Sequence, residues 1–182
     1  MNGGIRGAPP IVFALGSSAV WIAGDFWDSA AAAARELGRR AILVTGSTTP
    51  KNLPAGVRAF PYLGYSAVFP RAAAVVHQAG IGTLAQAMRA GRPQLIVPVA
   101  FDQPDNAHRA AALGIARVMP FRKVTARRLA SELAVLLEQP SYAREARAVA
   151  EALAKVDGAG CAAEELIACA RPGGGLFSTR QQ

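Results

Sequence analysis

Cysteine is nearly absent from this chain of 182 residues, which has Cys161 and Cys169 alone. The segment around them has the composition of a helix, in which the two side chains would lie roughly 12 Å apart along the axis. That separation is too large for a disulfide within an intact helix. The sequence therefore offers no disulfide framework, and a reducing compartment fits it.

Long apolar runs are absent as well. No stretch approaches the roughly 20 apolar residues that a membrane helix requires. The first ten residues, MNGGIRGAPP, lack the apolar centre of a signal peptide. We therefore expect a cytoplasmic protein without a membrane span.

Runs of like charge are also missing, although the formal net charge is +8. Arginine contributes most of the positive charge and is scattered along the chain, and only 7% of the residues are aromatic. Nucleic-acid binding usually requires clustered basic residues with aromatic residues among them. We interpret the charge as a solvated surface and expect no nucleic-acid partner, with a non-enzymatic basic binding module as an alternative.

The chain does contain a regular alternation of short apolar runs and Ala-rich stretches of helical length. Its apolar fraction of 52% is enough for one buried core at this length. The alternation is typical of an α/β fold with a doubly wound, mostly parallel sheet covered by helices. Six strands are predicted at 11–15, 41–44, 57–60, 74–77, 94–97 and 116–119.

Helices are predicted between and after these strands, most of them with a start or stop signal. Their expected starts are Asp25 or Asp28, Gly82, Asn106, Thr125 and Ser141, with a helical turn in LGYSAVFPRA and a last short helix after Gly158. We divide the chain into an N-terminal extension at 1–9, one domain at 10–170 and a tail at 171–182. The tail contains three consecutive glycines, and we expect it to be disordered.

Three polar loops follow predicted strands: GSS at 16–18, HQAGIGT at 77–83 and FDQPDN at 101–106. In a doubly wound sheet, ligands bind outside the carboxyl ends of the strands. We therefore expect these loops to share one edge of the sheet and to form a binding site.

The HQAGIGT loop has the features of a phosphate site. Gly80 and Gly82 let a ligand approach the backbone, and the positive end of the following helix points outward. Thr83 can add a hydroxyl donor, and His77 can add a ring N–H that binds more strongly when the imidazole is protonated. The structural alternative is a histidine bonded to a backbone carbonyl beside glycines that only allow close packing.

The FDQPDN loop places Asp102 and Gln103 side by side. Together they offer acceptor oxygens and an amide donor, a combination that suits the vicinal hydroxyls of a sugar. The alternative is an ordinary polar loop. Asn106 at the predicted helix start is explained equally well as a cap.

Taken together, LGSS, YLGY, HQAGIGT and AGRPQLIVPVAFDQPDNA resemble the C-terminal, donor-binding domain of nucleotide-sugar glycosyltransferases with the GT-B fold. Within that fold they are similar to the family of UDP-glucosyl, glucuronosyl and antibiotic glycosyltransferases, over about residues 10–155. The resemblance implies a Rossmann-like half of an enzyme that transfers a hexose from a UDP-sugar or TDP-sugar to a small-molecule hydroxyl, with inversion. It implies a nucleotide sugar as partner, no cofactor and no metal ligands.

The resemblance also assigns roles to single positions. It implies diphosphate binding by Gly16, Ser17, His77, Gly80, Gly82 and Thr83, sugar binding by Asp102 and Gln103, nucleobase binding by Tyr62 and Tyr65, and ribose binding by Gln86. Several positions depart from the family pattern. Gly64 replaces a frequent proline, and Tyr65 stands where a Gln or His is common. Ala79 stands where glycine is usual, which a wider turn would absorb, and Ala85 stands beside Gln86 where plant members have a ribose-binding glutamate.

The resemblance places the catalytic base outside this chain. Members of the family have an N-terminal domain that binds the acceptor and supplies a histidine as general base. This sequence begins almost directly at the first predicted strand, and its other histidine, His108, falls on a helix face that we interpret as solvated. We therefore expect an acceptor domain in cis or in a separate chain, and binding without turnover by the isolated chain.

An enzymatic alternative comes from GIGTLA at 80–85, which fits the dinucleotide fingerprint G-x-G-x-x-A after a strand. Asp102 lies at about the spacing of a ribose-binding acid. However, Pro98 closes the preceding strand before Asp102 is reached, and the fingerprint leaves the flanking HxxG and DQxxN patterns unexplained. An NAD- or NADP-binding Rossmann domain is therefore the alternative to a sugar-nucleotide domain.

Overall fold

The computed structural model describes residues 7–16, 20–48 and 50–170, and its centre is a six-stranded sheet. The strand order is β3-β2-β1-β4-β5-β6, and every neighbouring pair is parallel. The strands are β1 (Ile11–Ala14), β2 (Ala41–Val44), β3 (Val57–Phe60), β4 (Ala74–His77), β5 (Gln94–Ile96) and β6 (Ala116–Val118). The predicted fold class is confirmed, and three strands end one residue earlier than predicted.

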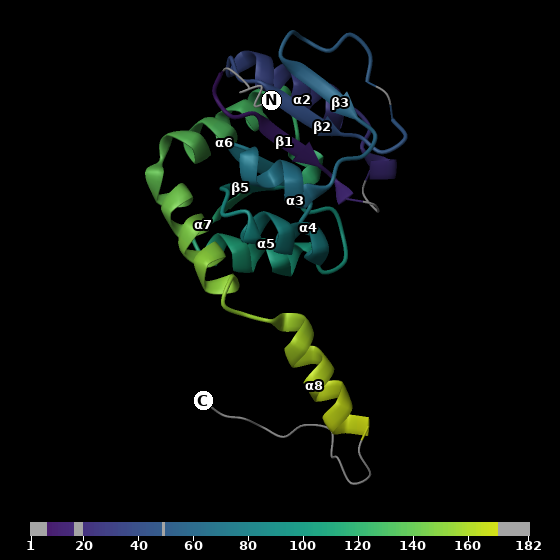
Figure 1. Cartoon of the computed structure of the whole chain (residues 1–182). Coiled ribbons are helices and arrows are strands. Elements are labelled where there is room, and N and C mark those ends of the chain that lie inside the picture. Colours follow the sequence, from purple (N-terminus) through teal and green to yellow (C-terminus); the bar gives the residue numbers. More distant parts are fainter. Residues whose placement is uncertain (1–6, 17–19, 49, 171–182) are drawn as a thin grey trace, which may run out of the picture.

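Helices follow each strand except β2, which a loop connects to β3, and further helices close the domain (Figure 1). They are α2 (Phe26–Glu36), α3 (Tyr65–Val68), α4 (Ile81–Arg89), α5 (Gln103–Ala112), α6 (Ala126–Glu138), α7 (Pro140–Leu153) and α8 (Gly158–Ala170), with short 3-10 segments at Val20–Ile22, Phe69–Arg71 and Phe121–Lys123. Thr125 caps α6 as predicted, because its hydroxyl accepts a hydrogen bond from the Arg128 N–H at 3.3 Å. In contrast, α5 begins three residues before the predicted start.

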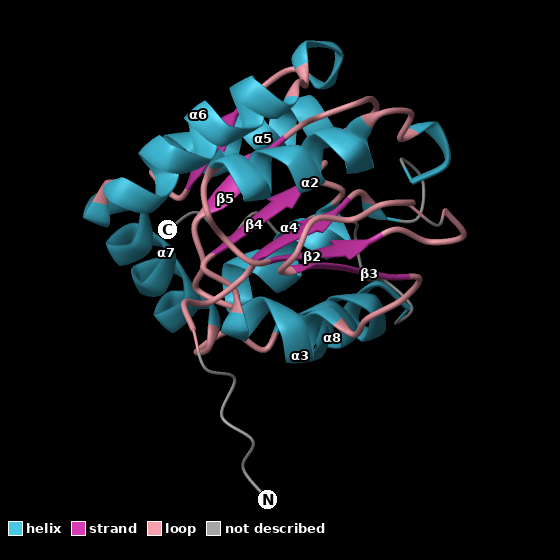
Figure 2. Ribbon diagram, turned by 90° about the horizontal axis from the view of Figure 1, so that it is seen from above, coloured by secondary structure: helices cyan, strands magenta, loops and turns pink. Residues whose placement is uncertain are grey.

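Helices cover both faces of the sheet, with α2 and α6 on one side and α3 on the other (Figure 2). Along β1, Phe13 packs in the core under α2 and α6, whereas Val12 packs against Phe69 and Ala87 on the opposite face. This follows from the alternation of side chains along a strand. Since both faces are covered, the strand carries apolar residues without a polar alternation, which explains the run IVFAL.

The carboxyl ends of all six parallel strands lie at one edge of the sheet, where the site was expected. The loops after β1, β4 and β5 are neighbours there because these strands are adjacent. Of the first loop, Gly16 is described, and Ser17 lies outside the described residues, as does the predicted tail.

The last helix, α8, extends away from the sheet beyond α7 (Figure 1). It has no buried residue, and both cysteines are exposed on it as free thiols. Within the part of the chain that the structure describes, no helix combines the length and the apolar composition needed to cross a bilayer.

Candidate functional site

The N-terminus of α4 opens onto the carboxyl edge of the sheet. Gly80 is the N-cap of this nine-residue helix, and its carbonyl accepts the hydrogen bond of the Leu84 N–H at 3.0 Å. The N–H groups of the first turn have no partner within the helix, and the helix dipole adds positive potential at this end. At Gly82 a side chain would meet no atom within 4 Å, so the space in front of the turn is open. This arrangement suits a phosphate.

His77 is the last residue of β4, and its side chain has no exposed surface. Its Nε2 lies 2.8 Å from the Oε1 of Gln94 on β5, and its Nδ1 accepts the Ala79 N–H at 3.0 Å. Since Nδ1 is an acceptor, the proton of the neutral ring is on Nε2, which donates to Gln94. Both ring nitrogens are therefore engaged within the protein. The prediction that His77 offers a ring N–H to a phosphate does not fit these contacts.

Burial also decides the charge of this imidazole. Desolvation lowers the pKa of His77 from 6.5 to about 4, and the hydrogen bond to Gln94 opposes that shift only in part. The ring is therefore neutral at neutral pH. A protonated imidazole beside a dianion, as the sequence suggested, is the state that burial disfavours most.

The next residue, Gln78, was missed in the sequence and lies at the predicted phosphate site. Its side chain is 3% exposed. A Cβ added at Gly16 would collide with the amide nitrogen of Gln78, and one at Gly80 would lie 2.8 Å from the same atom. The amide therefore fills the space between the loop after β1 and the start of α4. The available signal was its position, as the first polar residue beyond the buried strand and directly before the glycine turn.

Ala79 makes the turn from β4 into α4 with φ at +68°, in the left-handed region that L-residues rarely adopt. We expected a wider turn to absorb alanine at this position, and the positive φ of Ala79 shows a different solution. Instead Ala79 adopts the conformation that glycine would adopt freely, and its N–H is fixed by His77. The hydrogen bond from the Ala79 N–H to His77 therefore stabilises the conformation of the turn.

A cleft of about 480 Å³ lies beside this turn, over the ends of β1, β2 and β3. Its wall contains four residues predicted to bind the nucleotide, namely Gly16, Tyr62, Tyr65 and Gln86. Tyr62 is 80% exposed, so its ring is accessible for stacking. Tyr65 is already stacked on Phe69, with ring centroids 4.5 Å apart. Burial raises the pKa of Tyr65, and the nearby Tyr62 raises it further, so its hydroxyl remains protonated.

The two residues of the predicted sugar site differ in their environment. Gln103 is buried, and its Oε1 accepts the N–H groups of Val99 and Ala100 at 2.9 and 3.2 Å. This oxygen holds the loop after β5 and is not offered to a ligand. Sugar binding by Gln103 stays a prediction, and it would rest on the amide N–H₂ group. Asp102 is exposed and keeps a carboxylate at the edge of the sheet. Among the described residues, no group of three or more His, Cys, Asp or Glu side chains could hold a metal ion.

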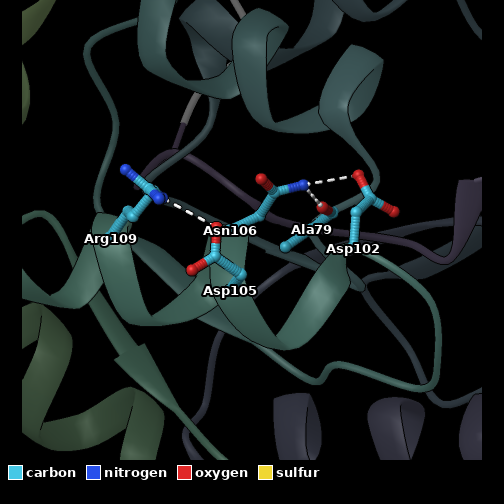
Figure 3. A network of polar contacts seen from close by, with 5 residues as sticks. All are labelled: Ala79, Asp102, Asp105, Asn106 and Arg109. Atoms are coloured by element: carbon cyan, nitrogen blue, oxygen red, sulfur yellow. Dashed lines mark hydrogen bonds and ion pairs between the residues drawn. The ribbon is translucent and has the colours of Figure 1, made fainter.

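Asn106 connects the two loops. Its Nδ2 donates to the Ala79 carbonyl at 2.9 Å and to Asp102 Oδ2 at 2.7 Å, so the amide lies between the turn after β4 and the loop after β5 (Figure 3). Because α5 begins at Gln103, Asn106 is inside the helix and does not act as its cap, contrary to one of the two explanations that its position allowed. Its role is to hold Asp102 against the turn.

We expect Asn106→Ala to reduce the free energy of unfolding by about 1 to 2 kcal/mol, because two hydrogen bonds are lost and the Ala79 carbonyl loses a partner. Affinity for a nucleotide sugar should fall several-fold as Asp102 loosens. Urea unfolding and calorimetric titration measure the two effects. Asp105→Ala is the matched control, because it breaks only the exposed Asp105–Arg109 pair on the same helix and should cost under about 0.5 kcal/mol. Equal effects of the two variants would contradict this role of Asn106.

The geometry can be compared with known proteins. A family model described as erythromycin biosynthesis protein CIII-like, C-terminal domain, matches residues 28–166. The chain belongs to this family. The match confirms the predicted resemblance to the donor-binding domain of an antibiotic glycosyltransferase, and neither alternative, the dinucleotide domain or the basic binding module, is favoured.

Individual glycosyltransferases and their solved structures are similar to this chain as well. The chain is 39% identical over 150 residues to O-mycaminosyltylonolide 6-deoxyallosyltransferase of Streptomyces fradiae, covering 81% of this chain and 35% of that protein. It is 36% identical over 168 residues to vancomycin aglycone glucosyltransferase of Amycolatopsis orientalis, covering 88% and 39%. The structure of glycosyltransferase VinC in complex with DTDP aligns with a TM-score of 0.77 at 26% identity, covering 90% and 42%. The chain thus spans well under half the length of these relatives.

Proposed function

We propose that this chain binds a nucleoside diphosphate sugar and forms the C-terminal part of an inverting glycosyltransferase that transfers a hexose to a hydroxyl of a small molecule. One observation carries the proposal. Gly16 belongs both to the wall of the aromatic cleft and to the packing around the start of α4, so a site for a base and a site for a phosphate are continuous. Family membership and the relatives named as glycosyltransferases support it.

The proposed ligand lies along the carboxyl edge. The base stacks at Tyr62 with Tyr65 beside it, the ribose reaches Gln86, and the diphosphate meets the N–H groups of the α4 start at Gly80 and Gly82. The hexose then points toward Asp102. During transfer, negative charge develops on the leaving diphosphate, and the unpaired N–H groups and dipole of α4 stabilise it. VinC, which was solved with DTDP, supports a thymidine diphosphate as the first ligand to test.

We further propose that the general base and the acceptor site belong to another domain, in the same or in a separate chain. His77 cannot serve as the base because it is buried with both nitrogens engaged, and His108 is exposed on α5. Several large apolar side chains are exposed in the loops and helix start that follow the strands, including Trp21 at 74%, Ile81 at 65% and Phe101 at 87%. Such a group of apolar residues is typical of a surface that contacts another protein unit.

Calorimetric titration with TDP, TDP-glucose, UDP-glucose and NAD tests the proposal. We expect binding of the nucleoside diphosphate and its sugar, and a rise in melting temperature with ligand concentration, because a ligand that binds only the folded state stabilises it. We expect no saturable binding of NAD. Preference for NAD, or no binding of any of these ligands, would exclude the proposed function.

A further inference from the structure

The indole of Trp27 is a buried polar group that the proposed donor site does not use. Trp27 is the second residue of α2, and its side chain is 2% exposed and packs in the same core as Phe13. Within the described ranges, its Nε1–H has no hydrogen-bond acceptor. A buried indole N–H is usually paired, because an unpaired one has lost the hydrogen bond that water provides in the unfolded chain. The unpaired donor therefore favours a ligand that brings an acceptor atom.

A cavity of about 460 Å³ adjoins this indole. Trp27 and Asp28 contribute to its wall from the start of α2, and Thr48, Lys51 and Asn52 contribute from the loop after β2. The volume is within the range of small-molecule sites. Among the residues that the structure describes, none lines both this cavity and the cleft assigned to the nucleotide. The cavity is therefore a separate place for a ligand.

The polar groups of the wall restrict the chemistry of such a ligand. The Trp27 indole and the Lys51 ammonium can only donate hydrogen bonds, and the Asp28 carboxylate can only accept them. Thr48 and Asn52 can do both. A carboxylate ligand would face the charge of Asp28, and an ammonium ligand would leave the indole unpaired and face Lys51. A neutral molecule with several hydroxyl groups can both accept and donate, so it satisfies the whole wall.

We propose that this cavity is a second ligand site, which binds a neutral saccharide unit, with the Trp27 Nε1–H donating to one of its hydroxyl oxygens. The inference does not rest on the proposed function, because the site needs neither a base nor a phosphate. The loop after β2 borders both cavities, with Gly46 at the nucleotide cleft and Thr48 at this one. A saccharide bound here therefore contacts a segment that also forms the wall of the nucleotide cleft.

The test uses the whole chain and methyl α-glucopyranoside as the probe. The chain has two tryptophans, so a proton–nitrogen NMR spectrum contains two indole N–H signals, which Trp21→Phe assigns. We expect the Trp27 signal to move downfield and to saturate with a Kd of about 1 mM, the order expected for so small a ligand. The signal of Trp21, which is 74% exposed, is the internal reference and should stay in place. Asp102→Ala should leave the titration unchanged, because Asp102 belongs to the proposed donor site.

Substitutions in the wall should weaken the binding of the glucoside. Asp28→Ala should raise the Kd about tenfold, the loss of one hydrogen bond to a charged group. Thr48→Val keeps the shape of the side chain without its hydroxyl and should raise the Kd several-fold. The matched control is Asp25→Ala, which removes an exposed carboxylate near the start of α2 that is outside the wall of this cavity. It should leave the Kd unchanged, and thermal unfolding verifies that each variant is folded.

Three results would overturn the inference. The first is a Trp27 signal that does not move with the glucoside. The second is equal weakening by Asp28→Ala and Asp25→Ala. The third is a Trp27 signal that moves with sodium acetate and not with the glucoside, which would mean that the cavity takes an anion. Failure of the chain to bind TDP would instead reject the proposed function and leave this inference standing.

Discussion

Between pH 6.5 and pH 4 the free energy of unfolding is expected to fall by roughly 3 kcal/mol because of His77 alone. The folded-state pKa of about 4 lies below the unfolded value of 6.5, because burial disfavours the charged ring. In this pH interval His77 is protonated in the unfolded chain and neutral in the folded chain. The contribution of the neutral His77 ring to the free energy of unfolding is fully present above pH 6.5. It declines as the pH falls and is lost below about pH 4.

Urea unfolding at a series of pH values measures this effect. His77→Asn does not titrate and should be less stable than wild type at pH 7, where Gln94 and the Ala79 N–H lose their partner. As the pH falls to 4, the difference between the two proteins should narrow by roughly 3 kcal/mol. His108→Asn serves as the control, because it makes the same substitution at a histidine that is exposed on α5. A constant difference between wild type and His77→Asn would show that His77 is not buried as the neutral ring.

Gly16→Ala is expected to weaken binding of TDP-glucose by at least tenfold, about 1.4 kcal/mol. Gly16 adopts φ of +65°, and an added methyl group would collide with the Gln78 amide. The substitution therefore imposes a left-handed alanine, which costs about 1 to 2 kcal/mol of stability, and it displaces a neighbour at the start of α4. Calorimetric titration measures the binding effect, and urea unfolding measures the change in stability.

The chain contains a control that separates these two costs. Gly24 also has a positive φ, +48°, but a Cβ there would meet nothing within 4 Å. Gly24→Ala should therefore destabilise the fold through its backbone alone and leave nucleotide-sugar affinity unchanged. If both variants bind TDP-glucose like wild type, Gly16 does not belong to the binding site.

The sequence predicted the sheet well because parallel strands covered on both faces must be apolar along their whole length. IVFAL, AILV and AVVH are short apolar runs bounded by turn residues, and each became a strand within one residue of the expected end. The early start of α5 was missed because the whole of FDQPDN, which contains Pro104, was interpreted as a polar loop. Proline is tolerated in the first turn of a helix, where its missing N–H has no partner to lose.

The site was predicted less completely than the fold. Its location followed from the positions of the loops, and Gly16, Tyr62, Tyr65 and Gln86 do line one cleft. The roles of His77 and Gln78 could not be separated from the sequence, because successive side chains at a strand end point in opposite directions. Which of the two side chains is hydrogen-bonded within the sheet depends on the neighbouring strand. That strand supplies Gln94, 17 residues away along the chain. The link through Asn106 depends likewise on a contact between distant loops.

The pairing of β1 with β4 has a consequence for how this protein acquires its site. Ile11 is in register with Ala74, so forming the middle of the sheet closes a loop of about 60 residues. Until that closure, Gly16 and Gln78 belong to separate, unconnected segments of chain, and no place for a phosphate exists. A sugar nucleotide can therefore slow the unfolding of the finished protein, but it cannot speed any step of folding that precedes this closure, because the contacts that it needs form only when the loop closes.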